Sequence, residues 1–464
     1  MNIKNIFLLL LISQLVFAGS PPNPTLSDMN GNTAGGSNTL ISNTGKDNTG
    51  FGNRVLINNS IGNNNTGVGS GTLSYNTYGS NNTATGAFSQ FFNLTGNENT
   101  SYGAFSSFIT NSGNYNTSVG TFSLYSNTTG NYNSAFGSNT LKYNIGNYNT
   151  GLGFNSMYYN TTGIGNTAVG VNSLYNNTIG NNNTGVGIQS IISNTTGSAN
   201  SALGTSTLLL NTTGNNNSAV GTNSLFSNTT GSTNSSFGVN SLYSNTIGNN
   251  NTAVGVQALQ KNVSGSDNTS VGTNSLQTNS TGENNTAIGR NALGANTTGL
   301  NNIALGSNAG ALLTTGSNNI MIGHTGNVAE TATIRIGQVQ TKTFIMGIRS
   351  VTNLPSSLPV YINNLGQLGV LASSERYKTN IQSIPNEDSN KIYSLKPVQY
   401  VYKDSKELEY GLIAEEVAKV YPNMVVYDKD GKVDAVQYHK LIPVLLKEIQ
   451  DLHNKLSQIT KNEK

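Results

Sequence analysis

The stretch Asn251-Thr252-Ala253-Val254-Gly255-Val256-Gln257-Ala258-Leu259 decides the fold, because its pattern returns along most of the 464-residue chain. The motif Asn-Thr/Ser-x-apolar-Gly recurs about 17 times, with its first glycine at Gly52 and its last at Gly323. Successive glycines are 17 residues apart, except for a spacing of 16 between Gly137 and Gly153. A fixed period of this length is the sequence signature of a repeat architecture in which neighbouring units stack.

Each unit carries two apolar positions that we expect to face inward. One directly precedes the glycine, as in Val254, and the other follows it four or five residues later, as in Leu259. Two such residues cannot hold one unit together, but stacked units bury a continuous stripe and align their Asn and Thr side chains as ladders. Residues 47–323 are therefore predicted to form a β-solenoid or β-roll shaft. The other clear pairs are Val169 with Leu174, Val220 with Leu225, and Ile288 with Leu293.

The units are joined by polar turns such as Asn177-Thr178-Ile179-Gly180. Gly and Asn suit these turns because both tolerate positive φ at low cost. The 16-residue unit is expected to lose its residue in such a turn, around Asn144-Ile145-Gly146. Triplets such as Asn64-Asn65-Thr66 match the glycosylation acceptor pattern, but turns rich in Asn and Thr generate them automatically. So thin an apolar stripe favours cover by partner chains, and we expect a homotrimeric fibre.

The composition excludes several classes of protein. The chain has 76 Asn, 53 Gly, no Cys and 9% charged residues, with a net charge of +3. Without Cys there are no disulfides and no Cys-based zinc sites. Lys and Arg form no long basic runs, so nucleic-acid binding is not expected. His324, His439 and His453 are isolated in the sequence, and we expect no metal and no cofactor.

The first 18 residues are predicted to be a signal peptide. Lys4 precedes an apolar run from Ile6 to Phe17, and small or apolar residues precede a cleavage point after Ala18. An uncleaved membrane anchor is the alternative, but this run is shorter than the about 20 residues that span a bilayer. We expect a protein that is secreted or lies on a cell or virion surface, with no membrane span. Residues 19–46 form a low-complexity segment before the shaft.

After Gly323 the composition changes to that of ordinary globular sequence. Residues 324–372 are predicted to be a β-rich connector, with strands between Ala332 and Met346 and a hairpin around residues 363–366. Of the 43 charged residues, 28 lie beyond Ser373, and residues 373–464 are predicted to form a small α+β domain. It should contain a helix over 411–420 and a hairpin turn over 428–431. A calcium loop at that turn is the weaker alternative, because the bidentate Glu is missing.

The last predicted helix carries a heptad pattern. Its apolar residues are spaced alternately by four and three, which is typical of a coiled-coil seam, whereas a helix packed on its own domain prefers a wider apolar face. Mixed Ile and Leu at these positions are compatible with three strands. The seam residues are Tyr438, Ile442, Leu445, Ile449, Leu452, Leu456 and Ile459.

Several motifs in this region resemble one known family. They are Gly366-Gln367-Leu368-Gly369, the run from Ser373 to Ile381, Leu395-Lys396-Pro397, the run from Gly411 to Val417, and the run from Tyr438 to Pro443. In this order they resemble the intramolecular chaperone of endosialidase, or peptidase S74, over about residues 360–460. The resemblance implies a C-terminal trimerisation chaperone that folds a fibrous β-structured protein and then cuts itself off. The repeats resemble, more loosely, those of trimeric adhesin heads and phage fibres.

The family's self-cleavage uses a Ser and a Lys five residues later, which correspond here to Ser373 and Lys378. A Ser hydroxyl needs a base, and a lysine amine serves as one only where burial or nearby cations lower its pKa from about 10.4. Arg376 is a candidate for such a cation. The scissile bond would be Ala372-Ser373. Ser374 departs from the Asp that the family often has at this position.

Three functions remain open on the sequence. The first is a secreted trimeric fibre whose chaperone domain matures by autoproteolysis, and the second is a non-cleaving adhesin that keeps this domain as a trimerisation cap. Either could bind a host-surface glycan or receptor. A glycan-degrading fibre is the weakest, because a glycosidase needs two carboxylates across one bond and Glu98, Asp267 and Glu283 form no repeated pair.

Overall fold

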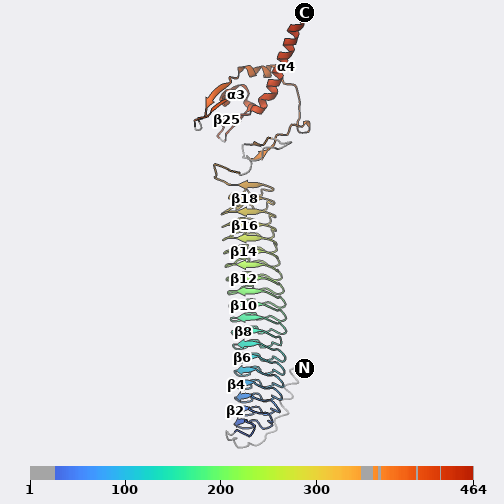
Figure 1. Ribbon diagram of the computed structural model, residues 1–464, viewed down its shortest axis with the longest axis vertical. Helices are drawn as coiled ribbons and strands as arrows, with labels where there is room; N and C mark the ends of the chain where they lie inside the picture. Colours follow the sequence, from blue (N-terminus) through green and yellow to red (C-terminus); the bar gives the residue numbers. More distant parts are fainter. Residues whose placement is uncertain (1–26, 346–358, 364–366, 404–405, 429, 463–464) are drawn as a thin grey trace. The chain divides into compact units, whose positions relative to one another are not determined.

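The computed structural model describes residues 27–345, 359–363, 367–403, 406–428 and 430–462 (Figure 1). The chain divides into two compact units, Met1–Lys342 and Thr343–Lys464, and each is described by itself. The predicted signal peptide lies outside the described residues. Within the described ranges, no helix is both long and apolar enough to cross a membrane.

The first unit is a β-solenoid in which each coil contributes one short strand (Figure 1). The 19 strands form one parallel sheet, and each strand pairs with the next along the chain. The register equals the sequence period, so that Thr252 lies beside Thr269 and Val254 beside Val271. This confirms the predicted β-solenoid. The strands are β1 Thr33–Gly35, β2 Thr49–Phe51, β3 Thr66–Val68, β4 Thr83–Thr85, β5 Thr100–Tyr102, β6 Thr117–Val119, β7 Ser134–Phe136, β8 Thr150–Leu152, β9 Thr167–Val169, β10 Thr184–Val186, β11 Ser201–Leu203, β12 Ser218–Val220, β13 Ser235–Phe237, β14 Thr252–Val254, β15 Thr269–Val271, β16 Thr286–Ile288, β17 Ile303–Leu305, β18 Ile320–Ile322 and β19 Ile334–Ile336.

The interior of each coil holds only one of the two predicted apolar positions. The leucine four residues after the glycine, such as Leu259, is fully buried as predicted. The position directly before the glycine faces outward instead, because the middle residue of a three-residue strand points inward and its neighbours point outward. Ala253 occupies the interior place. The prediction is therefore wrong for Val220, Val254 and Ile288, which are 37–40% exposed, and for Val169, which is partly exposed.

Two columns of buried asparagines run through the solenoid, as predicted. In the first column, the backbone N–H and Nδ2 of Asn268 both donate to Oδ1 of Asn251 in the preceding coil, each at 3.1 Å. In the second column, Nδ2 of Asn262 donates to Oδ1 of Asn245 at 2.7 Å and to the Gly265 carbonyl at 2.8 Å. These bonds satisfy side-chain amides that water cannot reach. In both columns a coil donates to the coil before it.

The repeat glycine lets consecutive coils touch backbone to backbone. Gly255 has φ +137°, and a Cβ at this position would lie 2.6 Å from the carbonyl oxygen of Gly272 in the next coil. Only glycine combines this backbone conformation with this close approach. Turn asparagines such as Asn182, with φ 56°, also behave as predicted. The positive φ of the buried Leu259, 52°, was not anticipated from the sequence.

The single 16-residue coil loses its residue in a turn, as predicted. Nδ2 of Asn144 reaches the carbonyl of Gly146, two residues on, whereas the same bond from Asn177 to Gly180 spans three residues. Oδ1 of Asn144 still accepts Nδ2 of Asn160 in the next coil at 2.6 Å. The second asparagine column therefore continues through the shortened coil.

The apolar interior is interrupted in two successive coils. Gln90 and Ser107 stand where other coils have the buried leucine. They separate a small buried cluster that includes Leu73 from a long one that begins at Leu124. The described part of the shaft therefore has two apolar cores.

A buried polar network fills this interruption. Nε2 of Gln90 donates to Oγ of Ser101 at 2.9 Å, and Oγ of Ser118 lies 2.9 Å from Oγ of Ser101 and 2.7 Å from Oγ of Ser107. The network does not satisfy every group. Within the described residues, three buried atoms of one coil have no hydrogen-bond partner, namely Oγ of Ser89, Oε1 of Gln90 and Oδ1 of Asn93.

Charged groups close both ends of the first asparagine column. At its start, Oδ2 of Asp28 accepts Nδ2 of Asn32 at 3.0 Å. At its end, Nδ2 of Asn319 donates to the Glu330 carbonyl at 2.7 Å, and the Glu330 carboxylate pairs with Nη2 of Arg335 at 2.6 Å. Arg335 lies in β19, the one strand that the described residues form between 332 and 345; residue 346, also predicted to be strand, lies outside them.

The second unit contains three antiparallel two-stranded ribbons and a long C-terminal helix. The predicted hairpins are confirmed, and Oδ1 of Asp428 accepts the backbone N–H groups of Asp430 and Lys432 within the second of them. The helix predicted over 411–420 begins later, because residues 408–411 pair as a strand. The elements are β20 Tyr361–Ile362, β21 Leu368–Gly369, η2 Glu375–Tyr377, α2 Asn386–Ser389, η3 Asn390–Ser394, β22 Val398–Val401, β23 Leu408–Gly411, α3 Ala414–Val420, η4 Pro422–Met424, β24 Val425–Tyr427, β25 Val433–Val436 and α4 Tyr438–Asn462.

Candidate functional site

Ser373 and Lys378 meet across a single turn of 3-10 helix. The turn η2 lies between them, and it is closed by the backbone N–H of Tyr377 donating to the Ser374 carbonyl at 3.1 Å and that of Lys378 donating to the Glu375 carbonyl at 2.9 Å. This fold of the chain brings Nζ of Lys378 to 3.2 Å from Oγ of Ser373. The two predicted site residues are thus within hydrogen-bond distance.

The pair opens onto a cavity of about 1130 Å³ in the C-terminal unit. Ala372, Ser373 and Lys378 line one part of it, and residues from the start of α4, including His439 and Lys440, line another. Both Ser373 and Lys378 are exposed in the single chain. A hydroxyl beside an amine at the edge of an open cavity has room for a peptide carbonyl to be attacked, with the amine as the proton acceptor.

Arg376, the cation suggested from the sequence, lies over its neighbour's ring. Its guanidinium carbon is 4.8 Å from the centre of the Tyr377 ring, which is a cation–π distance. His439 lies on the cavity wall with its ring centre 5.1 Å from that of Tyr361 in β20. This contact joins the hairpin that precedes the cleavage point to the first turn of α4.

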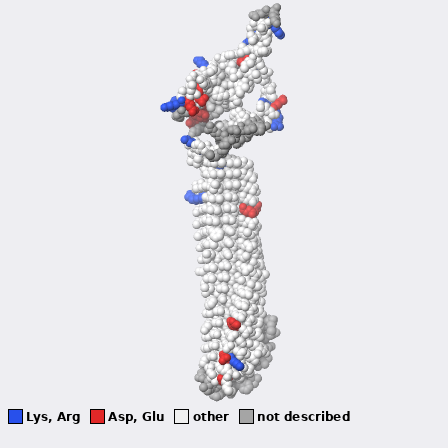
Figure 2. Space-filling view, viewed as in Figure 1, with Lys and Arg blue, Asp and Glu red and all other residues white. Residues whose placement is uncertain are grey.

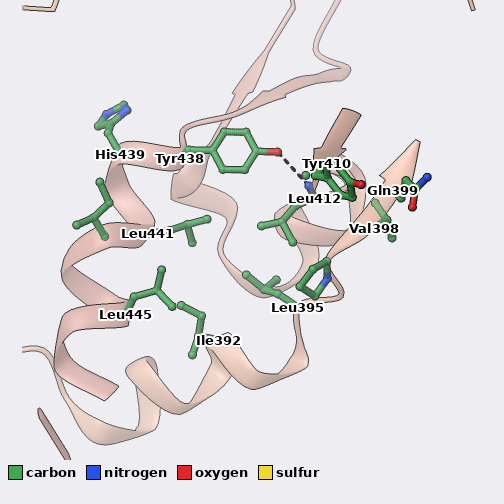
Figure 3. A pocket seen from close by; sticks show the side chains of 13 residues that line it. Ile392, Leu395, Val398, Gln399, Tyr410, Leu412, Tyr438, His439, Leu441 and Leu445 are labelled. Atoms are coloured by element: carbon green, nitrogen blue, oxygen red, sulfur yellow. Dashed lines mark hydrogen bonds between the residues drawn. The ribbon is translucent and has the colours of Figure 1, made fainter. Parts of the chain in front are cut away.

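An apolar groove of about 950 Å³ lies between α4 and the ribbon β22–β23 (Figure 3). Its polar anchor is the Tyr438 hydroxyl, which accepts the backbone N–H of Leu412 at 2.9 Å. Gly411 makes room for this contact, since a Cβ there would lie 2.6 Å from the same hydroxyl. Behind the ribbon, a hydrogen bond with Tyr402 raises the pKa of Tyr400 to about 12. The sequence gave no indication of this groove.

Helix α4 confirms the predicted helix and presents two different faces. Leu441 and Val444 are buried and pack with Val417 of α3 in the core of the domain. All seven predicted seam residues are instead 47–64% exposed. The first of them, Tyr438, Ile442 and Leu445, form one wall of the groove, so the seam and the groove make one continuous apolar surface.

The remaining candidate residues do not come together in the described part of the chain. Glu98 lies ten coils before Asp267, and its carboxylate raises the pKa of Tyr115 in the next coil. Nδ1 of His324 accepts the backbone N–H of Gly326 at 2.8 Å. No group of three His, Cys, Asp or Glu side chains in the described ranges is placed to hold a metal ion.

Sequence reasoning also missed an aromatic cluster around one shaft cation. Nζ of Lys142 lies 4.9 Å from the ring centre of Phe122 and 5.2 Å from that of Tyr158. Lys142 occupies the place of a ring in a stack that continues on both sides, with Phe108 on Tyr125 and Tyr158 on Tyr175. The spacing of these aromatics, one per coil, was the signal that could have revealed it.

The comparisons with known proteins agree with the C-terminal site. Residues 373–426 match the model of the chaperone of endosialidase family, peptidase S74. The match begins at Ser373 and includes Lys378, both strands of the ribbon β22–β23, and α3. No curated protein and no solved structure matches the chain. Near its C-terminus, after a long β-solenoid of 17-residue repeats, this chain carries a segment of the chaperone of endosialidase family.

Proposed function

We propose that the chain is a secreted, homotrimeric fibre of tail-fibre or adhesin type whose C-terminal domain assists trimer folding and then releases itself. The release is a cleavage between Ala372 and Ser373. The observation that carries the proposal is the 3.2 Å separation of Lys378 Nζ and Ser373 Oγ, at the start of the segment that matches the chaperone family.

The first step is an attack by Ser373 on its own peptide bond. Deprotonated Nζ of Lys378 takes the proton from Oγ, and Oγ bonds to the carbonyl carbon of Ala372. The bond between this carbon and the Ser373 nitrogen then breaks, and the nitrogen leaves as an amine after it takes a proton. The product is an ester between the Ala372 acyl group and the Ser373 side chain.

Hydrolysis of the ester completes the release. A water molecule adds to the ester carbon, and Lys378 again accepts a proton. The carbon–oxygen bond to Ser373 breaks, so that residue 372 keeps a carboxylate and Ser373 becomes the amino terminus of a 92-residue fragment, residues 373–464. The step consumes one water and needs no cofactor. Because the serine attacks its own chain, each molecule cleaves once.

Assembly is proposed to precede cleavage. The seam of α4 is exposed along the helix, and its heptad spacing suits a three-stranded coiled coil. Ser373 and Lys378 are also exposed in the single chain, where the amine keeps its water. Cover by neighbouring copies would exclude water from the pair, which favours the uncharged amine that the reaction needs. Cleavage would then report a correctly assembled trimer.

The signal-like first 18 residues support a secreted or virion protein, and the shaft is proposed to project from that surface. It displays uncharged Asn, Thr and Tyr side chains, which suit a host-surface glycan or receptor. Among the charged residues of the shaft, no two carboxylates recur as a pair from coil to coil. We therefore propose binding, and not glycan degradation, for this part of the chain.

Denaturing gel electrophoresis of the full chain tests the cleavage. We expect a fragment whose amino terminus, read by mass spectrometry, is Ser373, and its absence from the Ser373→Ala variant. Ser374→Ala is the matched control, because it removes a hydroxyl one residue away and should cleave normally. Lys378→Arg keeps the charge but supplies a much weaker base, so it should not cleave. Intact chain in the wild type and in both serine variants would show that the domain is a permanent cap.

A further inference from the structure

An outward-facing apolar column runs along the whole solenoid. It consists of the residue directly before each repeat glycine in strands β2 to β18, and we call it the outer stripe. Every member is apolar or aromatic except Thr85. The members are Phe51, Val68, Thr85, Tyr102, Val119, Phe136, Leu152, Val169, Val186, Leu203, Val220, Phe237, Val254, Val271, Ile288, Leu305 and Ile322.

The outer stripe is too large to be an incidental feature of a soluble surface. Most of its members are 37–52% exposed, from Val220 at the low end to Leu203 at the high end. With about 60 Å² exposed at each of 17 positions, the stripe offers about 1,000 Å², more than the about 800 Å² per partner of a standard specific interface. Monomeric proteins rarely expose a contiguous apolar patch of this size.

The surroundings of the stripe narrow down what can cover it. The shaft carries only nine charged residues between residues 33 and 323, and Figure 2 shows few of them on the face it presents. None lies in the stripe, and the column on the other side of the glycine contains only one, Arg290. The cover must therefore be apolar and uncharged over about 75 Å, the length of 17 strands at their usual spacing. A second copy of this shaft has this length, period and polarity.

We propose that the outer stripe is the surface through which copies of this chain associate, with identical residues of parallel copies facing one another. The inference rests on the proposed trimeric fibre and names the shaft surface that holds it. Association in register follows from the chain itself. The stripe repeats in every coil, and the exposed seam of α4 at the C-terminal end requires all copies to run in the same direction.

The opposite side of the coil provides a control surface. Leu203 and Leu210 belong to one repeat unit, directly before and six residues after Gly204. Leu203 lies in the stripe and is 52% exposed, whereas Leu210 follows the inward-facing Leu208 on the returning segment and is 39% exposed. The two differ in side of the coil, but not in residue type. If exposure alone drove association, both would report it.

Cysteine cross-linking tests the inference without interference, because the chain has no cysteine. Leu203→Cys and Leu210→Cys are made in the full chain, with and without Ser373→Ala, and treated with a short bis-maleimide. We expect covalent dimers on a denaturing gel for Leu203→Cys only. Light scattering on Leu203→Lys and Leu210→Lys shafts gives a second readout, with loss of association expected for Leu203→Lys alone.

The outcomes separate this inference from the proposed function. A trimer by light scattering in which Leu210→Cys cross-links and Leu203→Cys does not overturns the outer stripe as the interface, while the fibre stands. Cross-linking of Leu203→Cys in a chain that never cleaves supports the stripe and removes the autoproteolysis. A monomer that cross-links at neither position overturns both.

Discussion

Oδ1 of Asn93 is buried without a hydrogen-bond partner among the described residues, and the residue one coil later in its column is Thr110. Elsewhere this position is an asparagine whose Nδ2 donates to the coil before it, as Asn76 does to Asn59 at 2.7 Å. The Thr110 hydroxyl bonds to the Ser107 carbonyl instead, at 2.8 Å. The second asparagine column is therefore broken at one known place.

Thr110→Asn should repair this break and stabilise the shaft. The new Nδ2 would donate to Asn93, and its Oδ1 would accept Nδ2 of Asn127 from the following coil. A hydrogen bond to a buried, previously unpaired group contributes about 1–3 kcal/mol. We expect a gain of about 1–2 kcal/mol after the loss of the threonine bond, measured by chemical denaturation. Thr110→Ala, which cannot make these bonds, is the control, and equal stability of the two variants would contradict the role of the column.

Leu259→Ala should destabilise the solenoid by about 2–5 kcal/mol, the range for truncating a fully buried leucine. Leu210→Ala is the matched control, because this leucine is 39% exposed, and it should cost less than about 1 kcal/mol. Thermal unfolding of the purified shaft measures both. Similar losses at the two positions would mean that the inward and outward sides of the coil are assigned incorrectly.

Gly255→Ala should be among the most damaging single substitutions in the shaft. The added methyl group would lie 2.6 Å from the Gly272 carbonyl oxygen, and φ is +137°. Strain of this kind costs about 1–3 kcal/mol before the steric clash is counted. Gly323→Ala serves for comparison, because a Cβ there meets no atom within 4 Å. Circular dichroism during heating should show a much larger shift for Gly255→Ala, and a reversed order would be inconsistent with backbone contact between coils.

The Glu330–Arg335 pair should make the end of the shaft sensitive to acid. The hydrogen bond with Arg335 lowers the pKa of the Glu330 carboxyl below its ordinary value. The folded state thus holds this proton less tightly than the unfolded state, whose pKa is about 4.3. The contribution is fully present above that value and is lost as the pH falls through the lower folded pKa.

Glu330→Gln should abolish that part of the acid sensitivity. We expect the variant to be less stable than the wild type at pH 7, with the difference shrinking as the pH drops below about 4. Amide hydrogen exchange in the last coils, followed at both pH values, reads the effect locally. A difference that grows on acidification would have the wrong sign for this ion pair.

The period of the sequence predicted the solenoid, the buried leucine and the asparagine columns, because each requires only that like residues recur one coil apart. It did not predict which strand residue points inward. Val254 is more hydrophobic than Ala253, and hydrophobicity alone favours the valine. The coil is too narrow for a second large side chain opposite Leu259, so volume decides, and volume depends on the coil's cross-section.

The candidate site shows the same division. The motif identified Ser373 and Lys378, but five residues of extended chain would separate them by about 17 Å. Their contact depends on the intervening 3-10 turn, which the spacing did not reveal. The groove beside α4 depends on the pairing of β22 with β23, a contact between segments that no local pattern specifies.

The uniform direction of the asparagine columns has a consequence for how the length of the shaft can change. Every internal coil accepts from its successor and donates to its predecessor through the same atoms, and only the residues around Asp28 and Glu330 differ. A whole coil can therefore be gained or lost, through slippage between nearly identical gene segments, without creating a junction that the structure does not already contain. Reach from the surface becomes a heritable variable that is independent of folding.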